Sequence, residues 1–231
     1  ATPDLDVAMF DRAIYSHTLQ SDDWKIYPTI VTKTADRDEK EVYTVIEKWY
    51  NDGKYVPYSM EEVKQVILHA MIRVPRHVRI SRIFRDIPMI NIEGGANVPN
   101  LREELDKLME ANGDVCECIR SREVKDRRVD PEDIRLCVHE FKASYAREFF
   151  ISFESKEKKT GERVLHSFLR LRLPNKNHNT NNYIRELQSA ALIREVHVYG
   201  QMIPTYNKLI GNNEIFKSCL LYTSDAADDV I

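Results

Sequence analysis

Two cysteines separated by one residue, Cys116 and Cys118, are the clearest metal-binding candidates in the sequence. Zinc binds thiolate sulfur well, but structural zinc sites use four Cys or His ligands, usually at spacings wider than C-x-C. Cys137 and His139 would complete such a set if the fold brought them close. The alternative is two buried, reduced cysteines in an intracellular protein. Spacing alone leaves both interpretations open.

Arginine is concentrated in two short stretches of a chain whose net charge is only −3. The basic residues are Arg73, Arg76, Arg79, Arg82 and Arg85, and then Arg120, Arg122, Lys125, Arg127 and Arg128. Local clusters of positive charge suit a polyanion that contacts one face of the protein. Solvated arginines paired with nearby acids are the alternative. On a strand, Arg79 and Arg85 would share a face and Arg82 would take the other.

A third candidate is the run Arg194–Gly200, in which polar and apolar residues alternate. On a strand, Glu195, His197 and Tyr199 would lie on one face, with Val196 and Val198 on the other. A carboxylate, an imidazole and a phenol in one row are able to transfer protons. Ordinary strand surface has the same pattern, so the row indicates catalysis without establishing it.

Composition excludes several other classes of protein. The chain has 231 residues, of which 31% are charged and 42% hydrophobic, as in a globular protein. Four cysteines are too few for a disulfide scaffold. We find no Walker loop, no G-x-G-x-x-G, no H-E-x-x-H and no G-x-S-x-G. Without a membrane-length apolar run or a signal-peptide core, the sequence predicts a cytoplasmic protein with no membrane partner.

Helices and strands alternate in the first half of the predicted fold. Helices are expected after Thr2-Pro3, over 42–50, and after the capping boxes Ser59/Glu62 and Asn100/Glu103. Runs rich in β-branched and aromatic residues at 25–31 and 78–83 lie between them. This alternation, which continues to about residue 113, predicts βα units of an α/β domain.

Beyond that point apolar and polar residues alternate singly, which is typical of strands. The pattern begins at Ile134, Phe149 and Leu169, and a turn signal at 159–162 predicts an antiparallel hairpin over 148–173. One more strand is predicted over 191–199. The predicted fold class is therefore α/β plus α+β, with a boundary near 113–130.

The two ends of the chain have unusual sequences. The first residue is Ala, and helix is predicted from the outset, so we expect the chain to begin within a fold. Residues 219–231 begin with a run, Cys219–Asp229, that resembles a translated sequencing-library adapter; a genuine acidic tail is the alternative. We leave 219–231 out of the functional inference.

Seven stretches together carry a more specific signal. They are Thr2–Asp6, Lys25–Thr29, Val78–Pro88, Asn100–Arg102, Cys116–Val124, Leu169–Leu173 and Leu192–Gly200. In this order and spacing the chain resembles, from residue 2 to about 206, the catalytic subunit of Elongator and its stand-alone relatives, the tRNA carboxymethyluridine synthases.

The resemblance implies a domain organisation. Residues 1–113 would be the C-terminal portion of a TIM-like radical S-adenosylmethionine (SAM) barrel. Residues 114–145 would be a linker that holds zinc in many relatives, through Cys116 and Cys118 here. Residues 146–218 would be the first antiparallel strands of a Gcn5-related acetyltransferase domain.

The resemblance also implies chemistry at the wobble uridine of tRNA. A [4Fe-4S] cluster, SAM and acetyl-CoA would serve carboxymethylation at uridine C5, with tRNA as partner, no DNA, and other Elongator-type subunits or a homodimer as further partners. Glu195, His197 and Tyr199 would lie beside the acetyl-CoA site. The tRNA-facing residues would be Arg73, Arg79, Arg82, Arg85, Arg120, Arg122, Arg127 and Arg128.

The sequence departs from the family pattern in three ways, and these departures limit which properties of the family we expect in this chain. The cluster's three-cysteine motif and the Q-x-x-G-x-G pyrophosphate loop are not found in the sequence, and Ser121 stands where prokaryotic relatives often have a third cysteine. We therefore expect an internal fragment of the enzyme, inactive alone. A non-catalytic tRNA-binding homologue is the alternative. A plain acetyltransferase is a third option, against which the α/β half argues.

Overall fold

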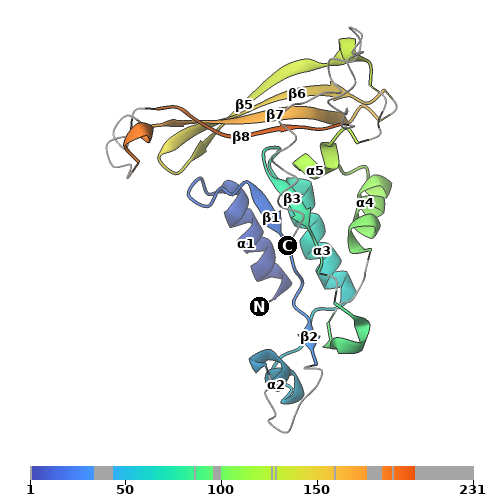
Figure 1. Cartoon of the computed structure of the whole chain (residues 1–231). Coiled ribbons are helices and arrows are strands. Elements are labelled where there is room, and N and C mark those ends of the chain that lie inside the picture. Colours follow the sequence, from blue (N-terminus) through green and yellow to red (C-terminus); the bar gives the residue numbers. More distant parts are fainter. Residues whose placement is uncertain are drawn as a thin grey trace, which may run out of the picture. The chain divides into compact units, whose positions relative to one another are not determined.

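The computed structural model describes most of the chain as two compact units. The described residues are 2–33, 44–85, 87–95, 100–125, 127, 129–158, 160–175, 184–188 and 190–200. Unit 1 comprises Ala1–Ser16 and Ser21–Arg120, and unit 2 comprises His17–Gln20 and Ser121–Ile231. Each unit has its own packing, and we describe each by itself (Figure 1).

Unit 1 contains a β-α-β arrangement. The strands β1 (Asp23–Lys25) and β3 (Arg79–Arg82) are parallel neighbours, and α3 (Met60–Arg73) lies between them in the chain. The helix begins at the expected capping box, in which Ser59 Oγ accepts from the Glu62 N–H and the Glu62 carboxylate accepts from the Ser59 N–H. This part of the predicted α/β pattern is confirmed.

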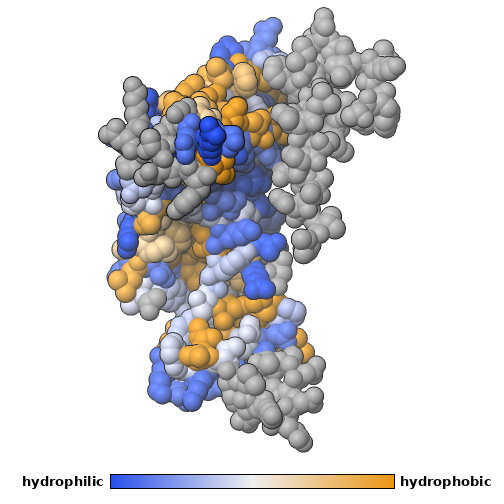
Figure 2. All heavy atoms as spheres, turned by 60° about the vertical axis from the view of Figure 1, so that its left-hand side comes forward, coloured by the Kyte–Doolittle hydropathy of each residue, from blue (hydrophilic) through white to orange (hydrophobic). Residues whose placement is uncertain are grey.

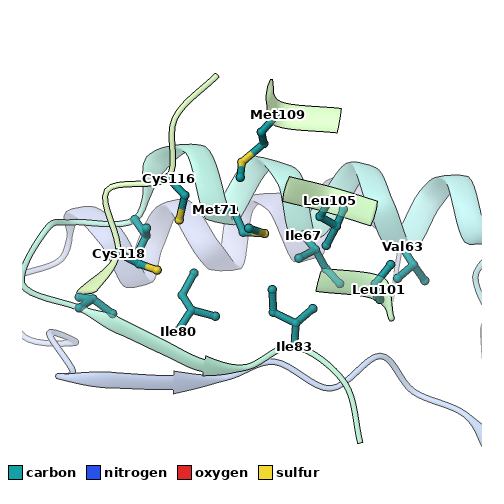
Figure 3. Packing of buried hydrophobic residues seen from close by; sticks show 12 residues of the cluster. Val63, Ile67, Met71, Ile80, Ile83, Leu101, Leu105, Met109, Cys116 and Cys118 are labelled. Atoms are coloured by element: carbon teal, nitrogen blue, oxygen red, sulfur yellow. The ribbon is translucent and has the colours of Figure 1, made fainter. Parts of the chain in front are cut away.

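The core of unit 1 lies between α3, β3 and α4 (Leu101–Asn112). Figure 3 shows the packed side chains. The cluster is formed by Val63, Ile67, Met71, Val74, Val78, Ile80, Ile83, Leu101, Leu105, Met109, Cys116 and Cys118. The i, i+4 spacing of Val63, Ile67 and Met71 places them on the inner face of α3. The helix α1 (Pro3–Tyr15) adds Phe10, which packs with Val66 and Ala70.

A smaller part of unit 1 joins β2 (Val31–Thr32), α2 (Val45–Asn51), the 3-10 helix η1 (Met89–Asn91) and β4 (Ile92–Gly94). The strands β2 and β4 are antiparallel. Tyr50 packs against β4 so closely that a Cβ at Gly94 would come within 2.8 Å of its ring. Glycine at this position therefore permits the contact between α2 and β4.

Unit 2 is built on one antiparallel sheet with the strand order β5-β6-β7-β8. The strands are β5 (Arg135–Ala143), β6 (Ala146–Lys156), β7 (Arg163–Pro174) and β8 (Leu192–Val198). Lys156 pairs with Arg163 and Glu148 with Arg172, so the predicted hairpin over 148–173 is confirmed. The alternation that begins at Ile134 predicted a strand, and the structure pairs 135–143, which the resemblance placed in the linker, with β6 along its whole length.

Three short helices complete the described elements. They are α5 (Ile119–Arg122), where the chain passes from unit 1 to unit 2, and the 3-10 helices η2 (Pro131–Asp133) and η4 (Arg185–Leu187). Among the described residues, no helix combines the length and the apolar character that a membrane span requires.

The two faces of the sheet differ in an unexpected way. One face carries Leu136, Val138, Phe153, Ile193 and Val196, whose exposed fractions range from 41% to 61%. Apolar residues reach the surface over the sheet in the upper part of Figure 2. The other face carries buried charged residues, among them Glu148, Glu154 and Arg170. The charged face of unit 2 is thus the more buried of the two.

Candidate functional site

The predicted row of Glu195, His197 and Tyr199 starts on β8. Glu195 is paired in register with Arg170 and His197 with Phe168, so both side chains belong to the charged face. The His197 ring stacks on Phe168 at 5.9 Å with an interplanar angle of 10°, and the Tyr199 ring centroid is 4.3 Å from that of His197. The structure therefore brings the three residues together in the order that alternation predicted.

Glu195 is held by a residue that the sequence reasoning did not select. Arg170 Nε donates to Glu195 Oε2 at 2.6 Å, and the Arg170 side chain is 2% exposed against 42% for Glu195. The guanidinium carbon lies 5.5 Å from the Phe150 ring and 5.2 Å from the Phe168 ring. These contacts stabilise a buried cation through two ring faces and one carboxylate. Glu195 is therefore an oriented anion, and His197 and Tyr199 are the groups in the row suited to moving a proton.

A second buried carboxylate on this face is Glu148. Its Oε1 accepts from Arg172 at 2.7 Å and its Oε2 from Arg194 at 3.0 Å. Because both oxygens are paired and the residue is 1% exposed, Glu148 joins β6, β7 and β8 rather than offering a free base.

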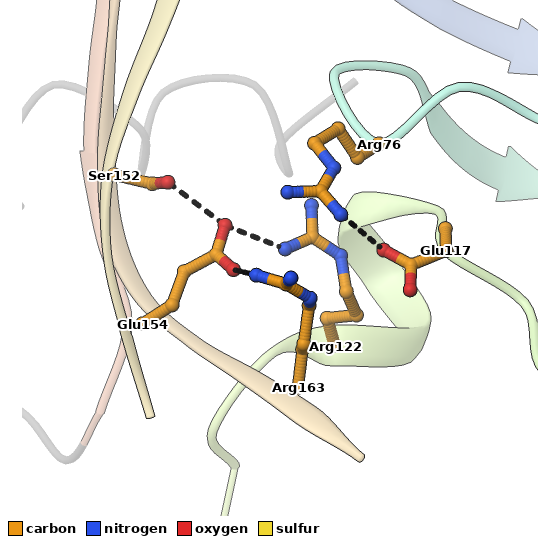
Figure 4. A network of polar contacts seen from close by, with 6 residues as sticks. All are labelled: Arg76, Glu117, Arg122, Ser152, Glu154 and Arg163. Atoms are coloured by element: carbon orange, nitrogen blue, oxygen red, sulfur yellow. Dashed lines mark hydrogen bonds and ion pairs between the residues drawn. The ribbon is translucent and has the colours of Figure 1, made fainter. Parts of the chain in front are cut away.

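A third carboxylate, Glu154, is buried among two arginines and a hydroxyl (Figure 4). Its Oε1 accepts from Arg122 at 2.9 Å and from Ser152 at 2.8 Å, and its Oε2 accepts from Arg163 at 3.3 Å. Burial by itself raises the pKa of Glu154, but the charge of Arg122 and the three hydrogen bonds outweigh it and hold the pKa below its ordinary value. Glu154 is thus an ionised structural group.

His166 is a further titratable residue in unit 2 that spacing did not reveal. Its Nε2 lies 2.9 Å from Ser155 Oγ, and its backbone carbonyl accepts from the Tyr199 N–H at 2.8 Å. Burial lowers the pKa of His166, although the charge of Glu154 opposes the shift. His166 is therefore biased toward its neutral form.

The arginines of the first basic stretch differ in exposure. Arg73, Arg82 and Arg85 are exposed, and none of the three forms an ion pair with another described residue. Arg79 is half-buried and has a partner. Because β3 ends at Arg82, Arg85 lies beyond the strand, and the predicted face shared by Arg79 and Arg85 does not apply.

The second basic stretch is mostly occupied within the protein. Arg120 is exposed but donates to the Ser81 carbonyl, and Arg122 is 3% exposed in its pair with Glu154. Arg127 is half-buried and donates to the Ser121 carbonyl at 3.3 Å. Arg128 lies outside the described residues. Arg122 thus has a structural partner that its neighbours in the sequence do not reveal.

A cavity of about 580 Å³ in unit 1 was not foreseen from the sequence. Its walls come from α1, the segment around β1, the loop before α3, and α3 itself. Tyr58 Oη donates to Asp6 Oδ2 at 2.9 Å in this wall, and burial together with that carboxylate raises the pKa of Tyr58 to about 12. The volume is within the range of small-molecule pockets. No spacing pattern marks it because its residues come from four separate segments.

The residues present do not fit the metal groups that the family implies. Cys116 and Cys118 are 4% and 0% exposed within the apolar cluster of unit 1. Within the described ranges, no group of three or more His, Cys, Asp or Glu residues is arranged to hold a metal ion. These ranges therefore supply neither four zinc ligands nor a cysteine triad for an iron–sulfur cluster.

Comparison with known proteins identifies the class of protein that the chain resembles. Residues 21–111, within unit 1, match the model of the Radical_SAM C-terminal domain. The chain is 36% identical over 208 residues to a tRNA uridine(34) acetyltransferase of Methanocaldococcus jannaschii, covering 87% of the chain and 35% of that protein. It is 29% identical over 209 residues to Elongator complex protein 3 of Saccharomyces cerevisiae, covering 88% and 35% respectively.

A solved structure supports the same relationship. The archaeal Methanocaldococcus infernus Elp3 with an N-terminal deletion superposes with a TM-score of 0.73 at 34% identity, over 87% of this chain and 44% of that chain. The family resemblance is confirmed: over most of its length the chain is a relative of the Elongator catalytic subunit and the tRNA uridine(34) acetyltransferases. It spans about a third of the length of these curated relatives.

Proposed function

We propose that the chain is part of an enzyme that modifies the wobble uridine of tRNA by carboxymethylation at C5. The observation that carries the proposal is the similarity to tRNA uridine(34) acetyltransferases, which covers 87% of the chain and so extends across both units. In such an enzyme a [4Fe-4S] cluster with SAM would supply a radical, and acetyl-CoA the carbon fragment. Among the described residues, no group of three or more His, Cys, Asp or Glu is arranged to hold the cluster, so the roles we propose for them are tRNA binding, orientation and proton transfer.

Exposed arginines are the groups of unit 1 suited to the tRNA backbone. Arg73, Arg82 and Arg85 are free of ion pairs with described residues, so a phosphate would not have to displace a carboxylate. Arg120 is also exposed, although it already donates to a carbonyl. Arg122 has no place in this surface, because its guanidinium is buried on Glu154. Affinity would come from the backbone contacts, and base selection from other parts of the enzyme.

The row on β8 would act on the acetyl group of acetyl-CoA. With its carboxylate held by Arg170, Glu195 is suited to orienting a neighbour or stabilising positive charge. The His197 ring stacks on Phe168 and meets the Tyr199 ring at a tilt of 40°, and these two contacts hold its ring plane. Proton transfer would therefore fall to His197 or Tyr199, with Glu195 as a positioning residue.

Two experiments test the proposal at different levels. Binding of this chain to bulk tRNA, measured across a potassium chloride series, should weaken steeply with salt, with a slope of log K against log salt of about −2 to −3 for three phosphate contacts. Nucleoside mass spectrometry of tRNA from cells lacking the gene should show loss of the carboxymethyl group at the wobble uridine.

The two results together distinguish the alternatives. A non-catalytic tRNA-binding homologue predicts salt-dependent binding with unchanged wobble nucleosides. An acetyltransferase acting on proteins or small molecules predicts neither effect. Salt-independent binding would count against the arginine surface while leaving the enzyme assignment to the nucleoside measurement.

A further inference from the structure

The segment that carries Cys116 and Cys118 is attached to unit 1 both by its side chains and by its backbone. Both thiols point into the cluster formed by α3, β3 and α4 (Figure 3). Immediately after Cys118, the Ile119 N–H donates to the Val78 carbonyl at 3.0 Å. The segment is thus packed and hydrogen-bonded to unit 1 through ordinary core contacts.

Arg102, on α4, provides a further attachment. Its Nη2 donates to Cys118 Sγ at 3.6 Å, its Nη1 donates to the Ile80 carbonyl at 3.1 Å, and its Nε lies 3.7 Å from Asp106 Oδ2. One guanidinium therefore links the first turns of α4, the strand β3 and the cysteine segment. The Cys118 sulfur therefore shares its lone-pair electrons with the Arg102 guanidinium, where a metal ligand would share them with the metal ion.

This arrangement is unfavourable for zinc. Zinc would lie about 2.3 Å from each sulfur, which places a doubly charged ion close to the Arg102 guanidinium in a site with little solvent. Within the part of the chain that the structure describes, no third Cys, His, Asp or Glu joins the two cysteines in a metal-holding group, and both cysteines are nearly inaccessible to water. The neighbouring Glu117 is paired with Arg76 at 3.3 Å (Figure 4), so a metal would have to compete with this ion pair for its carboxylate.

We infer that the C-x-C segment of this chain is a zinc-independent attachment, in which Arg102 and the apolar core take over the fastening role of a metal. The two thiols are free of disulfide bonds and buried in the core. Arg102 is the residue that positions the segment, through Cys118 Sγ and the carbonyl of Ile80. This inference concerns folding of unit 1 and stands whether or not the proposed tRNA activity is correct.

Metal content and thermal stability of the purified chain test the inference directly. The chain should carry well below 0.1 zinc per molecule, and incubation with EDTA or 1,10-phenanthroline should shift its melting temperature by less than about 1 °C. Stoichiometric zinc, together with a chelator-induced fall in melting temperature that added zinc reverses, would overturn it. These measurements need only the unmodified chain, so they decide the question even if variants fail to fold.

Variants then separate the role of Arg102 from that of a generic cation. Arg102→Met should lower the melting temperature by roughly 3–6 °C, because it removes two hydrogen bonds at a half-buried site. Lys64→Met is the matched control: Lys64 joins α3 to Glu104 on α4 in a 2.8 Å ion pair, without touching the cysteine segment. It should change the melting temperature by less than about 2 °C. Equal effects of the two variants would contradict the special role of Arg102.

Discussion

Arg170 and Glu195 form an asymmetric ion pair in which the cation is buried and the anion is partly exposed. The N–O distance is 2.6 Å, and the side chains are 2% and 42% exposed, respectively. The free-energy cost of removing the pair from water therefore falls mainly on Arg170. The ring faces of Phe150 and Phe168 offset part of this cost through cation–π contacts. Loss of the Glu195 carboxylate and loss of the Arg170 guanidinium should therefore change the free energy of unfolding by different amounts.

The first prediction follows from this asymmetry. Glu195→Gln should lower the free energy of unfolding by about 2 kcal/mol, since it removes the Glu195 carboxylate that is ion-paired with a buried guanidinium. Arg170→Met should cost less, about 1 kcal/mol, because water can solvate the carboxylate that remains. Urea denaturation of both variants and of the double variant Arg170→Met/Glu195→Gln measures the coupling between them.

The control for this cycle is the pair formed by Glu140 and Arg147, with a distance of 2.6 Å and side chains 46% and 53% exposed. Glu140→Gln should have a far smaller effect than Glu195→Gln, because both of these partners are solvated. If the two glutamine variants were equally destabilised, burial of Arg170 would not be the cause of the effect.

The second prediction concerns acid stability and Glu154. Its pKa in the folded protein lies below the ordinary value of 4.5, to which the unfolded chain returns. The unfolded state therefore binds a proton first as the pH falls, so the contribution of Glu154 is present above about pH 5 and is lost as the pH drops through the lowered pKa. Wild-type protein should lose stability steeply between pH 5 and pH 3.

Glu154→Gln tests this assignment. At pH 7 the variant should be less stable by about 3 kcal/mol, because the buried Arg122 loses its ion pair with Glu154. Its loss of stability on acidification should be shallower than that of the wild type, as the titrating group is gone. Parallel urea titrations at pH 7 and pH 4 provide the comparison. An unchanged pH dependence in the variant would assign the acid sensitivity to other carboxylates.

Local signals in the sequence predicted the helices and strands well, since their determinants lie within a few residues of one another. The capping box of Ser59 and Glu62 and the spacing of Val63, Ile67 and Met71 predict α3 without any tertiary information. The turn at Gly161, whose φ of 72° suits glycine, likewise predicts the β6–β7 hairpin.

The environments of the charged residues depend on distant partners and could not be read in the same way. Alternation indicates that Phe150 and Ile151 lie on opposite faces of the sheet, but it does not indicate which face is covered. Arg122 has the same local sequence character as Arg120, yet its partner Glu154 is 32 residues away. Arg170 likewise depends on Glu195, 25 residues away. Only the fold distinguishes buried arginines that are ion-paired from exposed arginines such as Arg82 and Arg85.

The third prediction applies that distinction to tRNA binding. Replacing Arg82 and Arg85 together by alanine should weaken tRNA binding and make the salt slope less negative by about 1.5, which corresponds to two lost phosphate contacts. Arg147→Ala removes an exposed arginine that is already paired with Glu140, so it should leave the slope unchanged. An equal effect from both changes would indicate general charge attraction without a defined surface.

The fourth prediction concerns the end of α4, where the chain turns toward the cysteine segment. Gly113 has φ 74° and ψ 18°, and its N–H and that of Asp114 donate to the carbonyls of Glu110 and Met109. Gly113→Ala should destabilise the protein by about 1 kcal/mol, because an L-residue resists this left-handed conformation. A Cβ would meet no atom within 4 Å, so a steric clash would not explain the loss.

Two further substitutions at this turn separate conformation from side-chain effects. Gly113→Asn should cost less than Gly113→Ala, since asparagine adopts the left-handed region more readily. Asn112→Ala, in the last helical residue, should be neutral or slightly stabilising because alanine favours the helix. Thermal denaturation of the three variants gives the ranking. Were Gly113→Asn to cost as much as Gly113→Ala, positive φ would not be what requires glycine where α4 ends.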